Sequence, residues 1–200
     1  MNISVVTAPD AEPVSLTEAK SHLRVEHDAD DDLINALIIA AREWVENYLN
    51  RALITQTRKL TIDRFPIYPL RLSGRPIQEI SSIKYIDSDG AEGTVDSGEY
   101  YLTDSGEVAL AYGGQWPSVT LRGPESIHIT YDCGYGTSSD SVPQCVRQAV
   151  LLLVGTWYEN REGSMLSSSQ SYQNEIPFGV RELLWPIRDL VVGRNSRHQN

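Results

Sequence analysis

The sequence predicts an α+β fold, mainly α, in which a bundle of about four helices carries an inserted antiparallel β lobe between the second and third helices. Three observations support this prediction. Helical periodicity dominates both ends of the chain, the middle alternates at the period of strands, and Gly and Pro divide that middle into short pieces. A length of 200 residues with 40% hydrophobic content suits one compact body with an inserted lobe.

We expect four consecutive parts along the chain. Residues 1–54 hold an extended N-terminal arm and the first two helices, and residues 55–140 form the β lobe. Residues 141–190 hold a central helix, a serine-rich loop and the last helix, and residues 191–200 form a C-terminal docking tail. The tail cannot bury enough surface to fold alone, so it is either disordered or ordered by a partner.

The first helix is predicted to begin after Ser15, because the sequence from Ser15 to Glu18 matches a capping box. It should end near Arg24. One apolar stripe runs along it, formed by Leu16, Ala19 and Leu23.

A longer second helix follows the acidic segment 27–32. Its apolar residues recur at helical intervals, at Leu33, Ala36, Leu37, Ala40, Ala41, Trp44, Val45, Tyr48 and Leu49. Asp28, Asp30 and Asp32 alternate like the opening of a calcium loop, but the glycine and the late glutamate of such a loop are missing. We interpret the cluster as carboxylates that cap the helix and complement its dipole.

Three isoleucines, Ile34, Ile38 and Ile39, lie beside this stripe and widen it. A wide apolar stripe has two explanations, a deeper core within the subunit or a contact with a neighbouring subunit. The sequence leaves both open.

The central helix, residues 141–163, has the strongest helical signal, and Pro143 suits its first turn. One face is formed by Val146, Ala149, Val150, Leu153, Trp157 and Tyr158. Leu151, Leu152 and Val154 lie off that face, so the middle of the helix is apolar all round. Such a helix is either central in its domain or shared with a neighbouring subunit, and its apolar run is too short to span a bilayer.

Alternation in the β lobe predicts strands over residues 57–64, 80–86, 100–103, 108–111 and 126–132. Asp87 to Gly90 should form a hairpin turn. In the last strand Ile127, Ile129 and Tyr131 should share one face. After the central helix, residues 164–175 are a polar, serine-rich loop, and residues 178–187 predict a short helix that is bent or ended at Pro186.

The net charge of −10 is concentrated near the N-terminus, where residues 1–50 carry ten acids and three bases. Tight binding of nucleic acid requires a concentrated basic face, which this distribution does not provide. An acidic surface could repel DNA, although solubility alone would explain the same charge. The N-terminus lacks the basic and apolar segments of a signal peptide, so we expect synthesis and folding in a cytoplasm.

No sequence motif for catalysis is present, and we predict no catalytic, cofactor-binding or metal-binding residue. Cys133 and Cys145 have no histidines at ligand spacing and are expected to be ordinary thiols. His128 is a candidate general base, but a histidine on a sheet face without catalytic use is the favoured interpretation.

Five blocks, in order, resemble the head-tail connector or adaptor proteins of tailed bacteriophages. They are VTAPDAEPVSLTEAKSHLRV (6–25), DDDLINALIIAAREWVENYLNRALITQT (30–57), AYGGQWP (111–117), VPQCVRQAVLLLVGTWYENRE (142–162) and IPFGVRELLWPIR (176–188). The resemblance implies a non-enzymatic virion protein at the head-tail junction. It also implies a ring, usually of twelve copies, that binds the portal and lines part of the channel through which DNA leaves.

Partners and contact residues follow from this resemblance. The expected partners are other copies of the chain, the portal, and head-closure or tail proteins, while DNA passes without specific binding and no membrane is involved. The candidate subunit interface consists of Ile34, Ile38, Ile39, Leu151, Leu152 and Val154. The candidate portal-docking residues are Val191, Val192, Arg194 and Arg197.

Two other functions remain open from the sequence. One is a head-closure or tail-completion ring from the same region of the virion. The other is a carbohydrate-binding or hydrolytic protein that uses aromatic residues of the β lobe, namely Tyr100, Tyr101, Tyr112 and Trp116.

Overall fold

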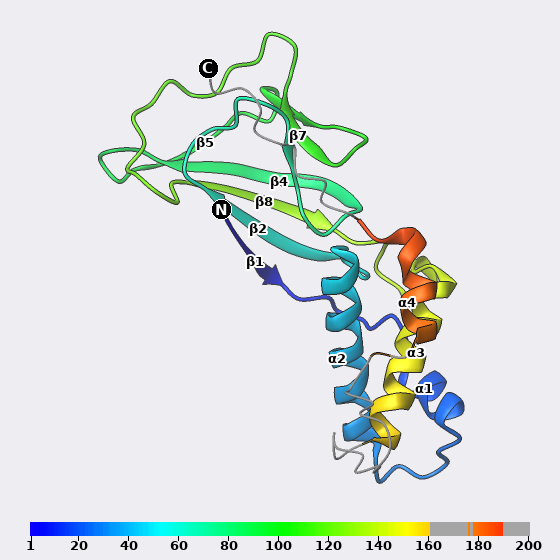
Figure 1. Cartoon of the computed structure of the whole chain (residues 1–200). Coiled ribbons are helices and arrows are strands. Elements are labelled where there is room, and N and C mark those ends of the chain that lie inside the picture. Colours follow the sequence, from blue (N-terminus) through cyan, green and yellow to red (C-terminus); the bar gives the residue numbers. More distant parts are fainter. Residues whose placement is uncertain (161–175, 177, 190–200) are drawn as a thin grey trace, which may run out of the picture.

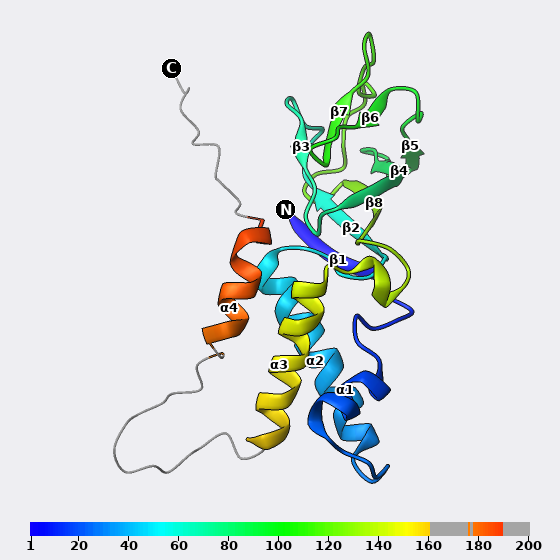
Figure 2. The same ribbon diagram turned by 90° about the vertical axis from the view of Figure 1, so that its right-hand side faces the viewer.

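The computed structural model describes residues 1–160, 176 and 178–189. A bundle of helices extends from one end of a β body, and the long helices point away from it (Figures 1 and 2). Its α-helices are α1 (Leu16–Leu23), α2 (Asp31–Leu49), α3 (Gln144–Glu159) and α4 (Phe178–Leu184), with short 3-10 helices η1 (Ser139–Ser141) and η2 (Trp185–Ile187). The predicted α+β class is confirmed, with a larger share of strand than "mainly α" implies.

Two antiparallel sheets make up the β body. The strands are β1 (Asn2–Thr7), β2 (Gln56–Ile62), β3 (Leu70–Arg71), β4 (Ile77–Ile86), β5 (Glu92–Thr94), β6 (Tyr100–Leu102), β7 (Glu107–Leu110) and β8 (Ile127–Cys133). The main sheet has the order β1-β2-β8-β4-β5, and the small sheet has the order β3-β7-β6. The predicted strands of the lobe are present, and the turn after β4 joins it to β5.

The two faces of the main sheet differ in polarity, as the alternation along β8 predicts. On the inner face, Ile129 lies opposite Leu60 of β2 and Ile83 of β4. These side chains form one core with Leu72, Val95, Tyr100 and Val108 from around the small sheet. On the outer face, Thr130 lies between Lys59 and Ser82. The small sheet therefore covers the inner face and leaves the outer face polar.

The N-terminal arm differs from its prediction, because it is part of the main sheet. Residues Asn2–Thr7 pair antiparallel with β2, from Asn2 opposite Thr61 to Thr7 opposite Thr57. Residues 1–54 are predicted to hold the arm and the first two helices, but residues 2–7 belong with the β lobe. The strand depends on its pairing with β2, which is distant in the sequence, and such a long-range contact leaves no local signal.

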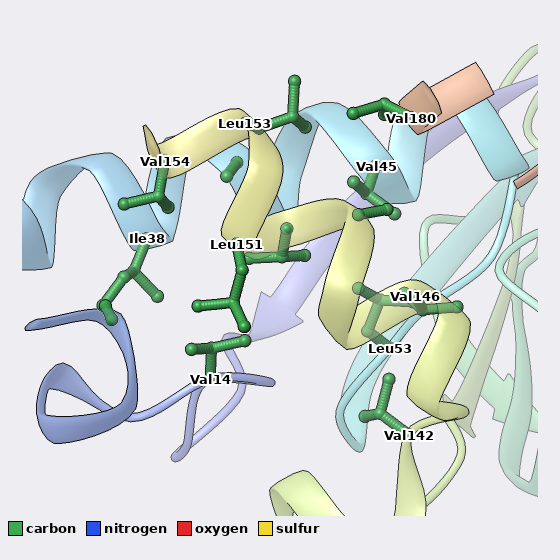
Figure 3. Close-up of a cluster of buried hydrophobic side chains, with 14 of the residues drawn as sticks. Val14, Ile38, Val45, Leu53, Val142, Val146, Leu151, Leu153, Val154 and Val180 are labelled. Atoms are coloured by element: carbon green, nitrogen blue, oxygen red, sulfur yellow. The ribbon is translucent and has the colours of Figure 1, made fainter. Parts of the chain in front are cut away.

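A second core lies within the helical bundle (Figure 3). The Ser15 hydroxyl accepts a hydrogen bond from the Glu18 N–H at 3.2 Å, which confirms the predicted cap of α1. Arg24 ends α1 and Asn50 ends α2, both in the left-handed conformation that closes helices. None of the described helices combines the length and the apolar character that crossing a membrane requires.

Two expectations for the helix ends need correction. Asp30 occupies the N-cap of α2 without a capping hydrogen bond from its side chain, and its carboxylate accepts instead from the Tyr158 hydroxyl at 2.5 Å. The central helix α3 ends at Glu159, with Asn160 as its C-cap, before the Gly163 that the sequence suggests as its stop. Gly163 and the serine-rich loop 164–175 lie outside the described residues.

Candidate subunit and partner contacts

The candidate chemistry of the β lobe does not form a site. His128 lies on the outer face with Nδ1 3.3 Å from Thr61 Oγ1, and burial, followed by the charge of Lys59, lowers its pKa. Cys133 is fully buried, and burial raises the pKa of its thiol to about 12. Among the described residues, no group of three or more His, Cys, Asp or Glu could hold a metal ion.

The aromatic residues considered for carbohydrate binding do not form one platform. Tyr100 is buried in the β core, whereas Tyr101 and Tyr112 are exposed. Trp116 stacks on Phe65, with ring centroids 5.3 Å apart, and donates its indole N–H to the carbonyl oxygen of Pro66 at 2.8 Å. One face and the polar group of the tryptophan are therefore used internally.

Four of the six candidate interface residues lie inside the subunit's own core. Ile34 and Ile38 of α2 and Leu151 and Val154 of α3 are all buried, and Figure 3 shows Ile38, Leu151 and Val154 directed into the bundle. The wide stripes exist because α2 packs against both α1 and α3, and α3 packs against α1, α2 and α4. These four positions have no surface left to offer a neighbour.

Ile39 and Leu152 remain accessible, Ile39 with 43% of its surface exposed and Leu152 half-buried. Ile39 belongs to a set of exposed apolar residues along the N-terminal half of α2, here called the outer stripe, that consists of Leu33, Ala36, Ile39 and Ala40. The two alanines allow another helix to approach closely. Among the described helices, the outer stripe therefore presents an exposed apolar surface of the kind that protein contacts use.

A buried charged cluster joins the bundle to the main sheet. Glu46 of α2 accepts hydrogen bonds from the Leu53 N–H at 2.8 Å and from the Gln56 side chain at 3.0 Å. Its other oxygen lies 3.4 Å from Arg42 Nη1 and 3.8 Å from Arg58 Nη2. The cluster therefore ties α2 to the linker that enters β2 and to β2 itself.

The same cluster reaches the segment before α1. Arg42 also donates to Glu12 at 2.8 Å. Burial raises the pKa of Glu12 above its ordinary value, against the opposing effect of Arg42. The segment before α1, helix α2 and strand β2 consequently meet at one fixed corner.

A second set of contacts fixes the last described residues against the body. Asp189 forms ion pairs with Arg71 and Arg75, and its N–H donates to the carbonyl of Leu49 at 2.9 Å. Arg51 donates to the carbonyl of Ile187 at 2.7 Å. Residues 187–189 are thus held at the junction of the bundle and the sheet. The candidate portal-docking residues, Val191, Val192, Arg194 and Arg197, lie outside the described residues.

The described residues thus form two apolar cores, a buried charged cluster that joins them, and an exposed apolar stripe on α2. A family profile described as "Head completion protein" matches residues 13–188. The chain therefore belongs to the head completion protein family, which confirms its resemblance to head-tail connector proteins of phages.

Solved structures of phage-like particles have the same fold. A chain in "Virion of native gene transfer agent (GTA) particle" has a TM-score of 0.77 and 24% identity, and the match covers 96% of this chain and 97% of that chain. A chain in "Neck of native GTA particle computed with C12 symmetry" has a TM-score of 0.73 and 25% identity, with the same coverage. The predicted virion location agrees with these neighbours. No curated protein matches the chain.

Proposed function

We propose that this protein forms a homo-oligomeric ring adaptor between the portal and the tail of a phage-like particle and lines part of the DNA exit channel. The match to head completion proteins over residues 13–188 is the observation that carries this proposal. Structures of similar chains come from particle necks computed with C12 and C6 symmetry, which supports a ring of twelve copies. The role is structural, with no turnover, and DNA passes without specific binding.

The outer stripe of α2 is the proposed ring contact. A closed ring joins one face of a subunit to a different face of the next. The outer stripe would supply the first of these two faces. Leu152, half-buried on α3, is a candidate for the other half. Ile34, Ile38, Leu151 and Val154 lie in the core of the bundle and contribute to this contact only by holding the helices in place.

Replacing Ile39 by Asp tests the ring contact. Ile39 is exposed, so the substitution should leave the subunit folded, whereas burying an unpaired carboxylate at each contact should cost about 2 kcal/mol or more. Native mass spectrometry should show a loss of rings in favour of monomers, and far-UV circular dichroism should show unchanged secondary structure. The matched control, Ile67→Asp, changes an exposed isoleucine of the β lobe and should assemble normally. Normal rings from Ile39→Asp would contradict this contact.

The C-terminal tail is the proposed portal-docking segment. It starts from the point that Asp189 fixes through Arg71 and Arg75, so the body determines where the tail begins. Val191 and Val192 could bury apolar surface in the portal. Arg194 and Arg197 could pair with acidic residues there.

Deleting residues 190–200 should abolish binding to the portal of the same particle while leaving the subunit folded, because the contacts of Asp189 are retained. Co-sedimentation with purified portal rings measures this directly. A deletion variant that still binds the portal would exclude the tail as the docking segment. Arg181→Ala, which removes an exposed arginine from α4, serves as the control and should bind normally.

A head-closure ring is a second candidate function, because the family description itself refers to head completion. Such a ring would bind tail or closure proteins rather than the portal. The same co-sedimentation experiment, repeated with the tail components, distinguishes the two functions by the partner that is retained.

A further inference from the structure

Strand β1 forms an open edge of the main sheet. Among the described strands it pairs with β2 alone, and all six of its residues are exposed. Its sequence, NISVVT, contains no charged residue and no proline. Soluble proteins usually protect exposed edge strands with such residues, because a bare edge pairs readily with other strands. An unprotected edge of this kind indicates that another strand covers it in the assembled protein.

The opposite side of the same sheet has a second open edge. Strand β5 pairs with β4 only at Lys84, Tyr85 and Ile86, and the Val95 N–H bonds to Ile83. Among the described strands, the remainder of β4, residues 77–82, pairs with β8 alone. The open part of β4 therefore has six residues, the same length as β1.

The two open edges match in polarity. On β1, Ile3 and Val5 lie on the inner face and remain partly exposed, while Ser4 lies on the outer face. On β4, Ile77 and Ile80 lie on the inner face, and Glu79 and Ser82 lie on the outer face. Joining the two edges would place apolar side chains beside apolar ones and polar side chains beside polar ones.

The directions of the strands also match. β1, β2, β8 and β4 alternate in direction, so β1 and β4 run opposite ways within one subunit. Rotation about a ring axis leaves the direction of a strand along that axis unchanged, and it carries inner faces to inner faces. The β1 strand of one copy therefore meets the open edge of β4 in the next copy antiparallel and with the same face inward.

On these grounds we infer that β1 of each subunit pairs with residues 77–82 of β4 in the neighbouring copy, so that the main sheet continues from subunit to subunit. This inference rests on the proposed ring and specifies a second contact within it. It explains why an uncharged N-terminal strand lies at the edge of the sheet. The pairing joins different surfaces of identical subunits, as a closed ring requires.

Cysteine cross-linking tests the pairing. Ser4, Lys59, Thr130 and Ser82 form one row across the sheet, so Ser4 and Ser82 of one subunit are three strand spacings, about 14 Å, apart. A disulfide requires a Cα separation below about 7 Å, and any disulfide between these positions must therefore join two copies. The pairing of β4 with β8 shifts register at two points, so Ser4→Cys is combined separately with Glu79→Cys and with Ser82→Cys.

The full chain carrying Cys145→Ser is used as the background, because Cys133 is buried and Cys145 is partly accessible. After mild oxidation of assembled protein, at least one of the two pairs should yield a ladder of covalent oligomers on non-reducing gels. Each single-cysteine variant, and Ser4→Cys combined with the exposed Ser88→Cys at the far turn, should yield no ladder.

Native mass spectrometry of the same samples separates this inference from the proposed ring. Rings without disulfide ladders would overturn the strand pairing and leave the ring intact. Ladders without rings would support the pairing and contradict the closed ring. Monomers without ladders would overturn both.

A charge on the edge strand gives an independent readout. Val5→Lys introduces the kind of residue that protects natural edges, and Val5 is 54% exposed, so the subunit should fold normally. The concentration at which rings dissociate should rise at least tenfold. Val119→Lys changes a valine of similar exposure in a loop and should leave it unchanged. Equal dissociation of the two variants would overturn the inference.

Discussion

Replacing Glu46 by Ala should reduce the free energy of unfolding by about 3–5 kcal/mol, one of the two largest effects expected from a single substitution in this chain. Only 8% of the Glu46 side chain is exposed. Its removal leaves the buried Leu53 N–H and the Gln56 amide without their acceptor. It also leaves the guanidinium groups of Arg42 and Arg58 near the junction without that carboxylate.

The effect should exceed that of an ordinary surface ion pair because one carboxylate serves helix, linker and sheet together. Glu46→Gln tests the charge separately, since the amide keeps the side-chain size but places an N–H group among donors. We expect Glu46→Gln to be destabilised by a smaller amount than Glu46→Ala, and both losses to appear in urea unfolding followed by circular dichroism.

Glu43 provides the matched control for Glu46. It lies one turn earlier on α2, its side chain is 62% exposed, and its carboxylate is 3.7 Å from the same Arg42. Glu43→Ala should change stability by about 0–1 kcal/mol, as exposed ion pairs do. If Glu46→Ala and Glu43→Ala differ by less than about 1 kcal/mol, the buried cluster does not hold the junction together.

The parts of the fold that depend on short-range patterns could be predicted from the sequence. The capping box at Ser15 needs only neighbouring residues, and the alternation around Ile129 is sufficient to place one face of β8 inward. The family resemblance rested on similarly local blocks. These signals do not depend on how distant segments meet.

The interface residues and the junction could not be predicted in the same way. Periodicity shows how wide an apolar stripe is, but Ile34 and Ile38 are buried because α1 and α3 cover α2 on two sides. Charged residues on a helix usually indicate solvent, so the burial of Arg42 and Glu46 had no signal in the sequence. Asp189 and Arg71 are 118 positions apart, and only the tertiary fold brings them together.

A glycine at the junction should be as intolerant of substitution as Glu46. Gly134 follows β8 directly, has φ of +130°, and donates its N–H to the carbonyl of Pro76 at 2.9 Å. A Cβ at this position would lie 2.6 Å from the carbonyl carbon and oxygen of Ile54 and 2.7 Å from the backbone nitrogen of Thr55. These are backbone atoms of the linker between α2 and β2, so they cannot move away by changing a rotamer.

Gly134→Ala should therefore destabilise the protein by about 3 kcal/mol or more, from backbone strain and overpacking combined. Gly123 separates these two causes, because it has a similar φ of +145° but no atom within 4 Å of a Cβ. Gly123→Ala should be destabilised by the backbone strain alone, by about 1–2 kcal/mol. Urea unfolding of the two variants measures the difference. Equal losses would mean that the linker yields to the added methyl group, and that the bundle and the sheet are joined less rigidly than the contacts of Glu46 and Asp189 require.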